Sequence, residues 1–244
     1  MKQIADDEIM RLASSKEVSS ADLERLADVL SKDKPMEDFA NALKGELWEN
    51  ELIGIGAIPD PATSKPEDFE VELRGHRFPV DRKATVTMLG SLYQKRLNGL
   101  SLPFKDQPNV EKEIDGLTAI LPKDWISTSA PTMSDIESLK MKVQLRSIKN
   151  PFGLRTVAYA QTVLGAGMLE SFVRSLREGR MQVLALRTTS FYRQHGTLPK
   201  SLSEVKGTNI DPFSGKPFAY NPTTRLIESS SPEGVKPLSV TIPN

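Results

Sequence analysis

The chain has 244 residues, 38% of them hydrophobic and 26% charged, a balance that is typical of globular proteins and argues against wholesale disorder. Lysine plus arginine and aspartate plus glutamate both number 32, so no net charge attracts nucleic acid, which is not an expected partner. The chain contains no cysteine, which excludes disulfides, thiol nucleophiles and cysteine-ligated metal centres.

The N-terminal part predicts three helices. Apolar residues recur at helical spacing in residues 5–13 and 20–31, which should form a hairpin, with Ser19 or Ser20 as the N-cap of the second helix. Pro35 suits the first position of a third helix, because its missing N–H has no intrahelical partner there. Gly54 and Gly56 are expected to end that helix.

The middle of the chain is rich in loops. Residues 58–79 carry several prolines with little periodicity and predict a long connection, with one short strand over residues 69–73. Helical spacing returns over residues 81–97, and a shorter helical turn is expected at 110–115. The rest of residues 98–131 is predicted to be irregular.

Two helices follow in the C-terminal half. The first begins at Ser134, and Asn150-Pro151 should end it because a residue before proline is pushed out of the α region. Its inward side chains are predicted to be Ile136, Leu139, Val143 and Ile148. The second, over residues 156–194, is the longest predicted element, with candidate interruptions at Gly165, Gly167 and Gly179.

The end of the long helix carries the sharpest local signals. His195-Gly196 and Pro199 predict its stop, since Gly196 can adopt a positive φ and proline cannot continue a helix. Ser201 to Glu204 has the form of a capping box. Residues 218–228 then alternate as in a β-hairpin, and the last residues are expected to form a loose tail.

These elements predict a mostly α fold: an irregular helical bundle with one long C-terminal helix followed by a small β-hairpin. Residues 1–57 hold the helical hairpin and third helix, 58–150 the loop-rich helical middle, and 151–244 the long helix and β-hairpin. One compact domain is expected overall. Five aromatic residues should form a satellite core with Pro199 and Leu202 beneath: Phe191, Tyr192, Phe213, Phe218 and Tyr220.

Residues 191–202 and 211–220 carry, in order, a helix ending in Tyr-Arg, a His-Gly pair, Pro-x-Ser-Leu and Asp-Pro-Phe-x-Gly-x-Pro. This order resembles the C-terminal segment of functionally uncharacterised planctomycete-type bacterial cell-envelope proteins, and is similar to the soluble part of type II secretion pseudopilins. Residues 42–46 and 150–153 look like counterparts of the helical part of those envelope proteins. The resemblance marks a structural motif: Tyr192, His195, Gly196, Pro199, Asp211, Pro212, Phe213, Gly215 and Tyr220.

The resemblance implies a helical ectodomain beside a membrane anchor, with no assigned activity. Met1 to Glu8 has no apolar core and does not indicate a signal peptide, and Val157–Val173 is too polar to span a bilayer. The expected location is therefore the cell envelope or periplasm, as an excised ectodomain whose anchor is absent from this chain. A cytoplasmic location is the alternative. Pseudopilins tend to hold calcium in a late loop, but residues 227–234 offer only Glu228 and Glu233, so no calcium is expected.

No catalytic pattern stands out among the ionisable residues. His76 and His195 are the only histidines and lack metal-ligand spacing, so no metal or cofactor is expected, and His76 should be exposed in the long loop. G-x-S-x-G and phosphate-binding loops are absent. Four arginines at Arg174, Arg177, Arg180 and Arg187, mixed with glutamates, suggest a solvated face of the long helix.

The sequence favours a non-enzymatic ectodomain or scaffold that acts through contacts with other proteins, whose identity it does not indicate. The alternative is a hydrolase or carbohydrate-active enzyme with a site in the loops at 54–80 and 98–131. Loops on a helical frame are where such a site is expected. Its candidate polar and aromatic residues are Asp60, Asp68, Asp106, Asp124 and Trp125.

Overall fold

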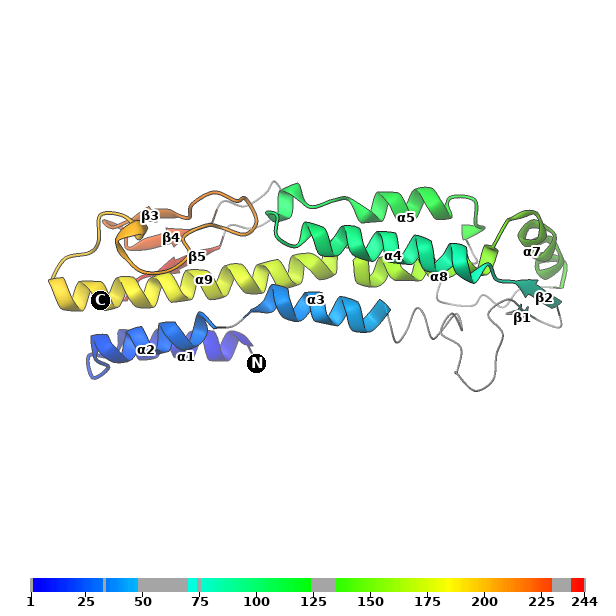
Figure 1. Ribbon diagram of the computed structural model, residues 1–244. Coiled ribbons are helices and arrows are strands. Elements are labelled where there is room, and N and C mark those ends of the chain that lie inside the picture. Colours follow the sequence, from blue (N-terminus) through cyan, green and yellow to red (C-terminus); the bar gives the residue numbers. More distant parts are fainter. Residues whose placement is uncertain are drawn as a thin grey trace. The chain divides into compact units, whose positions relative to one another are not determined.

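The computed structural model describes residues 2–32, 34–47, 70–73, 76–123, 135–229 and 238–243. This part of the chain is mostly helical, with a long C-terminal helix followed by a small antiparallel sheet, which confirms the predicted fold class (Figure 1). The chain divides into two compact units, whose boundaries differ from the three sequence segments. Unit 1 comprises Met1–Asp38, Ser101–Gln107 and Glu170–Asn244, and unit 2 comprises Phe39–Leu100 and Pro108–Leu169.

Unit 1 begins with the predicted helical hairpin. Its helices are α1 (Lys2–Ser14) and α2 (Ser20–Leu30). Ser19 is the N-cap of α2, and its side chain and that of Asp22 each accept a hydrogen bond from the other residue's backbone N–H. This capping box satisfies backbone donors that a helix start leaves unpaired. Helix α3 (Pro35–Glu46) begins at the predicted proline, and Gly54 and Gly56 lie outside the described residues.

The central element of unit 1 is α9 (Ala166–His195), which enters the unit from unit 2. Within unit 1 it lies between the α1–α2 hairpin and the sheet (Figure 1). Every residue from Met181 to Ser190 is buried, because both neighbours cover the helix there. Gly196, with φ of 72°, directly follows the helix, which confirms the predicted stop.

Three short strands close unit 1. The sheet has the order β3 (Ala219–Asn221), β4 (Leu226–Glu228) and β5 (Ser239–Thr241), with antiparallel neighbours. The predicted hairpin is confirmed as β3 and β4, and the predicted capping box opens the 3-10 helix η3 (Leu202–Glu204). The prediction of a loose C-terminal tail was wrong for residues 238–243, because β5 pairs with β4 and Ile242 is buried in the core.

Unit 2 contains three packed helices: α4 (Arg82–Gly99), α5 (Val110–Thr118) and α8 (Pro151–Leu164). Helix α7 (Asp135–Ser147) joins a second cluster through Leu145. The predicted inward position of Val143 was wrong, since that side chain is 65% exposed. The apolar face of α7 instead includes Leu145 and the half-buried Met141. These two residues are four apart and therefore lie on the same face of the helix.

A β-hairpin precedes α4. The predicted strand is β1 (Glu70–Leu73), and it pairs with β2 (His76–Pro79), which the sequence did not predict. The expectation that His76 lies in a loop was therefore wrong, because this residue pairs with Leu73 in the ladder. The segment has little periodicity of its own, and it forms a strand because it pairs with β1.

The starts of α4 and α8 share one amide side chain. Asn150 is the N-cap of α8, and its Oδ1 accepts hydrogen bonds from the backbone N–H groups of Gly153 (3.3 Å) and Asp81 (3.0 Å). Its Nδ2 donates to Thr85 Oγ1 at 2.9 Å, and a Cβ on Gly153 would lie 2.0 Å from that oxygen. Only glycine fits where the two helix starts meet.

The long predicted helix is interrupted at Gly165, one of its three predicted candidate positions for a break. Arg96, 2% exposed, donates from Nε to the carbonyl oxygen of Leu164 at 3.0 Å, and Glu111 Oε1 accepts the N–H of Ala166 at 2.7 Å. Opposite charges therefore lie at the end of α8 and the start of α9, as the helix dipoles favour. A Cβ on Gly165 would lie 2.6 Å from the carbonyl oxygen of Gln161.

Candidate functional site

The buried arginines of α9 are the most unusual polar feature of unit 1. Arg177 is 1% exposed and the side chain of Arg187 is 3% exposed, so the predicted solvated face was wrong for these two residues. Arg174 does lie on the exposed side, where it pairs with Glu170 at 3.1 Å. A buried charge is costly unless it is paired and hydrogen-bonded, so the partners of these arginines define the site.

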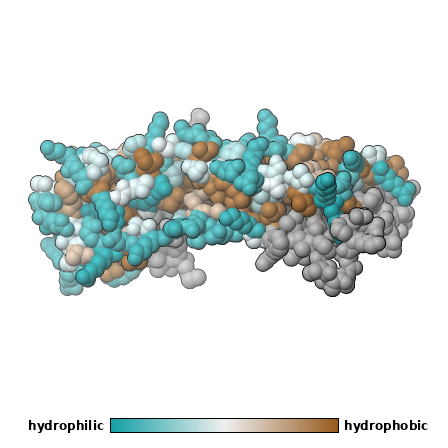
Figure 2. All heavy atoms as spheres, viewed as in Figure 1, coloured by the Kyte–Doolittle hydropathy of each residue, from teal (hydrophilic) through white to brown (hydrophobic). Residues whose placement is uncertain are grey.

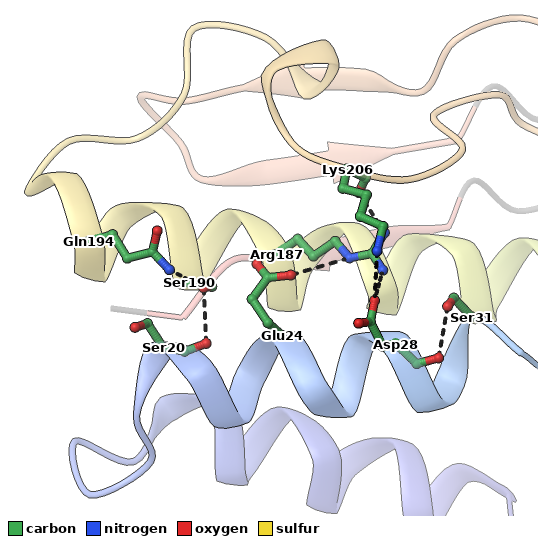
Figure 3. A network of polar contacts seen from close by, with 8 residues as sticks. All are labelled: Ser20, Glu24, Asp28, Ser31, Arg187, Ser190, Gln194 and Lys206. Carbon is green, nitrogen blue, oxygen red and sulfur yellow. Dashed lines mark hydrogen bonds and ion pairs between the residues drawn. The ribbon is translucent and has the colours of Figure 1, made fainter.

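Arg187 joins three parts of unit 1 (Figure 3). Its Nη2 donates to Asp28 Oδ1 at 2.7 Å, and its Nε lies 3.7 Å from a carboxylate oxygen of Glu24, both on α2. Its Nη1 donates to the carbonyl oxygen of Lys206 at 2.7 Å, beyond η3. The Lys206 ammonium, 3.3 Å from Asp28, and the Arg187 guanidinium together hold the pKa of the Asp28 carboxyl below its usual range.

Arg193 holds the turn between α1 and α2. Its Nη2 donates to the carbonyl oxygens of Ala13 (2.8 Å) and Ser15 (2.9 Å), and its Nη1 donates to that of Val18. Ser190 Oγ donates to the carbonyl oxygen of Ser20 at 3.1 Å. The Arg193 bonds satisfy carbonyl groups at the end of α1 and in the turn that follows it, and the Ser190 bond reaches the first residue of α2.

The Asp211 loop (Asp211–Gly215) and the preceding Ile210 contact Arg177 and Arg180 of α9. Asp211 is fully buried, and its Oδ1 accepts the N–H of Phe213 at 2.9 Å, which closes an Asx-turn. The guanidinium carbon of Arg177 lies 4.4 Å from the centroid of the Phe213 ring, and Arg180 Nη1 donates to the carbonyl oxygen of Ile210 at 2.8 Å. Burial lowers the pKa of Arg177 and Arg180, and the charge of Asp211 opposes this shift.

The loop also contacts the segment Ser101–Gln107, called here the 101–107 segment. The N–H of Phe104 donates to the carbonyl oxygen of Pro212 at 2.9 Å, and that of Lys105 to the carbonyl oxygen of Phe213 at 3.2 Å. The rings of Phe104 and Phe213 have centroids 5.0 Å apart. Gly215 has φ of 67°, and a Cβ there would lie 2.6 Å from Pro103 Cγ. Glycine therefore permits both this left-handed backbone conformation and the close approach of Pro103.

The predicted satellite core forms in part. Phe218 and Leu202 are buried in one apolar cluster with α9 and the sheet, against which Phe191 and Tyr220 pack. Phe213 lies instead between Arg177 and Phe104, so its predicted place in that core was wrong.

The remaining motif residues lie at the end of α9 and in the turn beyond it. The Tyr192 ring faces the Arg225 guanidinium at 4.7 Å, and the rings of His195 and Phe191 lie 4.3 Å apart. Gly196 provides the helix stop, and the carbonyl oxygen of Pro199 accepts the Tyr220 hydroxyl at 3.0 Å. Burial raises the pKa of the Tyr220 hydroxyl. These contacts hold the end of α9, the turn beyond it and the sheet together.

Of the five candidate residues of the alternative enzymatic site, only Asp106 lies in the described part of the chain. Asp106 lies in the 3-10 helix η2 (Phe104–Asp106), is exposed, and has its carboxylate 4.0 Å from Lys105 Nζ. Asp60, Asp68, Asp124 and Trp125 lie outside the described residues. Within the described ranges, no three histidine, aspartate or glutamate side chains gather into a group that could hold a metal ion.

Several large apolar side chains are exposed. On the face shown in Figure 2, hydrophobic and hydrophilic residues are intermixed over the described part of the chain. The exposed large apolar residues include Val29, at 62%, in unit 1 and Ile120, also at 62%, in unit 2. None of the helices in the described ranges is long and apolar enough to cross a bilayer.

Comparison with known proteins identifies no relative of this chain. It matches no family model, no curated protein and no solved structure.

Proposed function

We propose that the chain is a non-enzymatic helical scaffold of a bacterial cell-envelope protein, and that it acts through contacts with other proteins. The observation that carries this proposal is the use of the α9 arginines. Arg177, Arg180, Arg187 and Arg193 each bind backbone or side-chain groups of other elements in unit 1. The charged groups of the helix thus stabilise a fixed framework and present no convergent reactive set.

The sequence motif supports the envelope part of the proposal. The residues that resemble the envelope proteins, 191–202 and 211–220, include the end of α9 and the Asp211 loop. They supply Leu202 and Phe218 to the apolar cluster between α9 and the sheet, and the Tyr220 hydroxyl that donates to the carbonyl oxygen of Pro199. A shared framework with different exposed residues is how one fold serves different partners.

The proposal is tested by locating the full gene product and its contacts in the bacterium that encodes it. A chromosomally tagged protein is expected in the envelope fraction, with a periplasmic and a cytoplasmic marker as controls. A photo-crosslinking residue in place of the exposed Val29 should yield a discrete cross-linked protein, and one in place of the exposed Ala21, also on α2, serves as the matched control.

Two results would contradict the proposal. One is recovery of the tagged protein with the cytoplasmic marker alone. The other is turnover of ester or glycoside substrates by the purified chain that Asp106→Asn abolishes without loss of helical signal, because this result would favour the hydrolase alternative.

A further inference from the structure

The 101–107 segment is a small insertion into unit 1. The chain enters it from α4 and leaves it into α5, both of unit 2, so seven residues of unit 1 lie between two helices of the other unit. The side chains of Ser101, Lys105 and Asp106 are exposed, and Leu102 is 48% exposed. The segment is therefore bound to unit 1 mainly through Pro103 and Phe104.

The contacts of this segment are those of a recognised peptide turn. A helical turn leaves its first N–H groups without partners inside the turn. Those of Phe104 and Lys105, at the start of η2, donate to two successive carbonyl groups of the Asp211 loop. The Phe104 ring contacts Phe213, and Pro103 lies against Gly215. The loop thus contacts both the proline and the aromatic residue with which this turn begins.

The receiving loop is held in shape by bonds that do not involve the 101–107 segment. Asp211 accepts the N–H groups of Phe213 through its side chain (2.9 Å) and of Gly215 through its carbonyl (2.8 Å). Its own N–H donates to the carbonyl oxygen of Lys216 at 2.8 Å. Arg177 lies over the Phe213 ring, so the two accepting carbonyl groups and the ring are preorganised for a ligand.

We propose that the Asp211 loop is a binding site for a proline–aromatic turn, that the chain fills it with its own Pro103–Asp106, and that a partner protein binds by presenting such a turn in their place. This inference rests on the proposed function as a protein-contact scaffold and names the chemistry of one partner. The covalently attached turn competes at high effective concentration, so a partner binds only where it contributes further contacts or where the internal turn is released.

A labelled synthetic peptide of residues 101–107 tests the site on the full chain. Phe104→Ala removes the internal ring, and Leu102→Ala is the matched control because Leu102 is largely exposed. Fluorescence polarisation should show binding to the Phe104→Ala protein at least about tenfold tighter than to the wild type or the Leu102→Ala protein, since the internal competitor is weakened. A peptide that carries alanine at position 104 should not bind.

A second variant examines the loop itself. Adding Gly215→Ala to Phe104→Ala should abolish peptide binding, because the new Cβ would occupy the place of Pro103. If Phe104→Ala fails to fold, Lys105→Pro removes one internal hydrogen bond and should also admit the peptide.

The proposal is overturned if the folded variants, judged by circular dichroism, bind no peptide up to about 1 mM, or bind it equally with and without Gly215→Ala. Concentration-dependent dimerisation of the wild type that an excess of the 101–107 peptide suppresses would assign the site to a second copy of the chain and overturn binding of a different partner protein. None of these outcomes depends on cellular location, so failure here leaves the test of the scaffold function separate.

Discussion

The two units use different polar groups to hold their helices together. In unit 1, arginine side chains of α9 cross to elements far away in sequence, as in the bond from Arg187 to Asp28, 159 residues apart. In unit 2, polar side chains act at helix ends, where Asn150 binds the starts of α4 and α8 and Arg96 binds the end of α8. Unit 1 therefore depends on paired buried charge, and unit 2 on the close fit of helix termini.

Phe213→Ala is expected to give the largest loss of stability and to be specific to unit 1. The side chain is fully buried, so its removal leaves a cavity between Arg177 and Phe104 and should cost about 4 kcal/mol of unfolding free energy. Urea denaturation measures the loss, and Leu102→Ala, at a largely exposed position, should change stability by less than about 0.5 kcal/mol. An unchanged midpoint for Phe213→Ala would remove the Asp211 loop from the framework.

Gly153→Ala is the corresponding test of unit 2. The added Cβ would lie within 2.6 Å of three side-chain atoms of Thr85 and Asn150, so both helix caps must shift, at a cost of about 3 kcal/mol. Gly90→Ala is the matched control, because no atom lies within 4 Å of a Cβ there and alanine favours the helix by about 1 kcal/mol. Equal effects of the two substitutions would show that the fit around Asn150 does not matter.

Arg187→Met separates the two units most directly. It keeps the length of the buried side chain but removes its bonds to Asp28 and Lys206, at an expected cost of about 2 kcal/mol. Hydrogen exchange should accelerate in α2 more than in α4 and α8. Arg174→Met, at an exposed position on the same helix, should leave exchange in α2 unchanged. Uniform acceleration over both units would contradict the difference between them.

The smallest expected effect is a pH dependence confined to unit 1. Because the pKa of Asp28 is lowered in the folded protein, its carboxylate stabilises the fold above the usual aspartate pKa of about 4, and this contribution is lost as pH falls through the lowered value. The stability difference between the wild type and Asp28→Asn should therefore be full at pH 7 and shrink in acid. A difference that stays constant between pH 7 and pH 2 would contradict the ion pair.

Local signals in the sequence predicted most of the helices and their ends. Ser19, Pro35 and Gly196 act through their own backbone or the next turn, so their roles depend on neighbours that the sequence shows directly. Asn150 also binds Asp81 and Thr85, which are distant in sequence, so its full role could not be predicted in this way. Strand β5 could not be found in this way, because its partner β4 is supplied by the fold and its three residues carry no clear alternation.

The partners of the α9 arginines were not predictable for the same reason. Arg177 and Arg187 have the spacing of a solvated face, and only the packing of the hairpin and the Asp211 loop on α9 makes them buried. The one available signal was the run from Met181 to Leu186, which is apolar except for Gln182 and is unusual for a surface helix. No sequence pattern indicated the roles of Arg193, Glu24 and Asp28, because their partners are distant in sequence.

The ion pair of Asp28 with Arg187 also has a consequence for how the protein is made. The α1–α2 hairpin leaves the ribosome long before the helix that completes its apolar cluster and its ion pairs. With 159 residues between the two partners, translation at about 5–20 residues per second leaves the hairpin waiting for roughly 8–30 seconds. During that interval the apolar face of the nascent hairpin is open to chaperones.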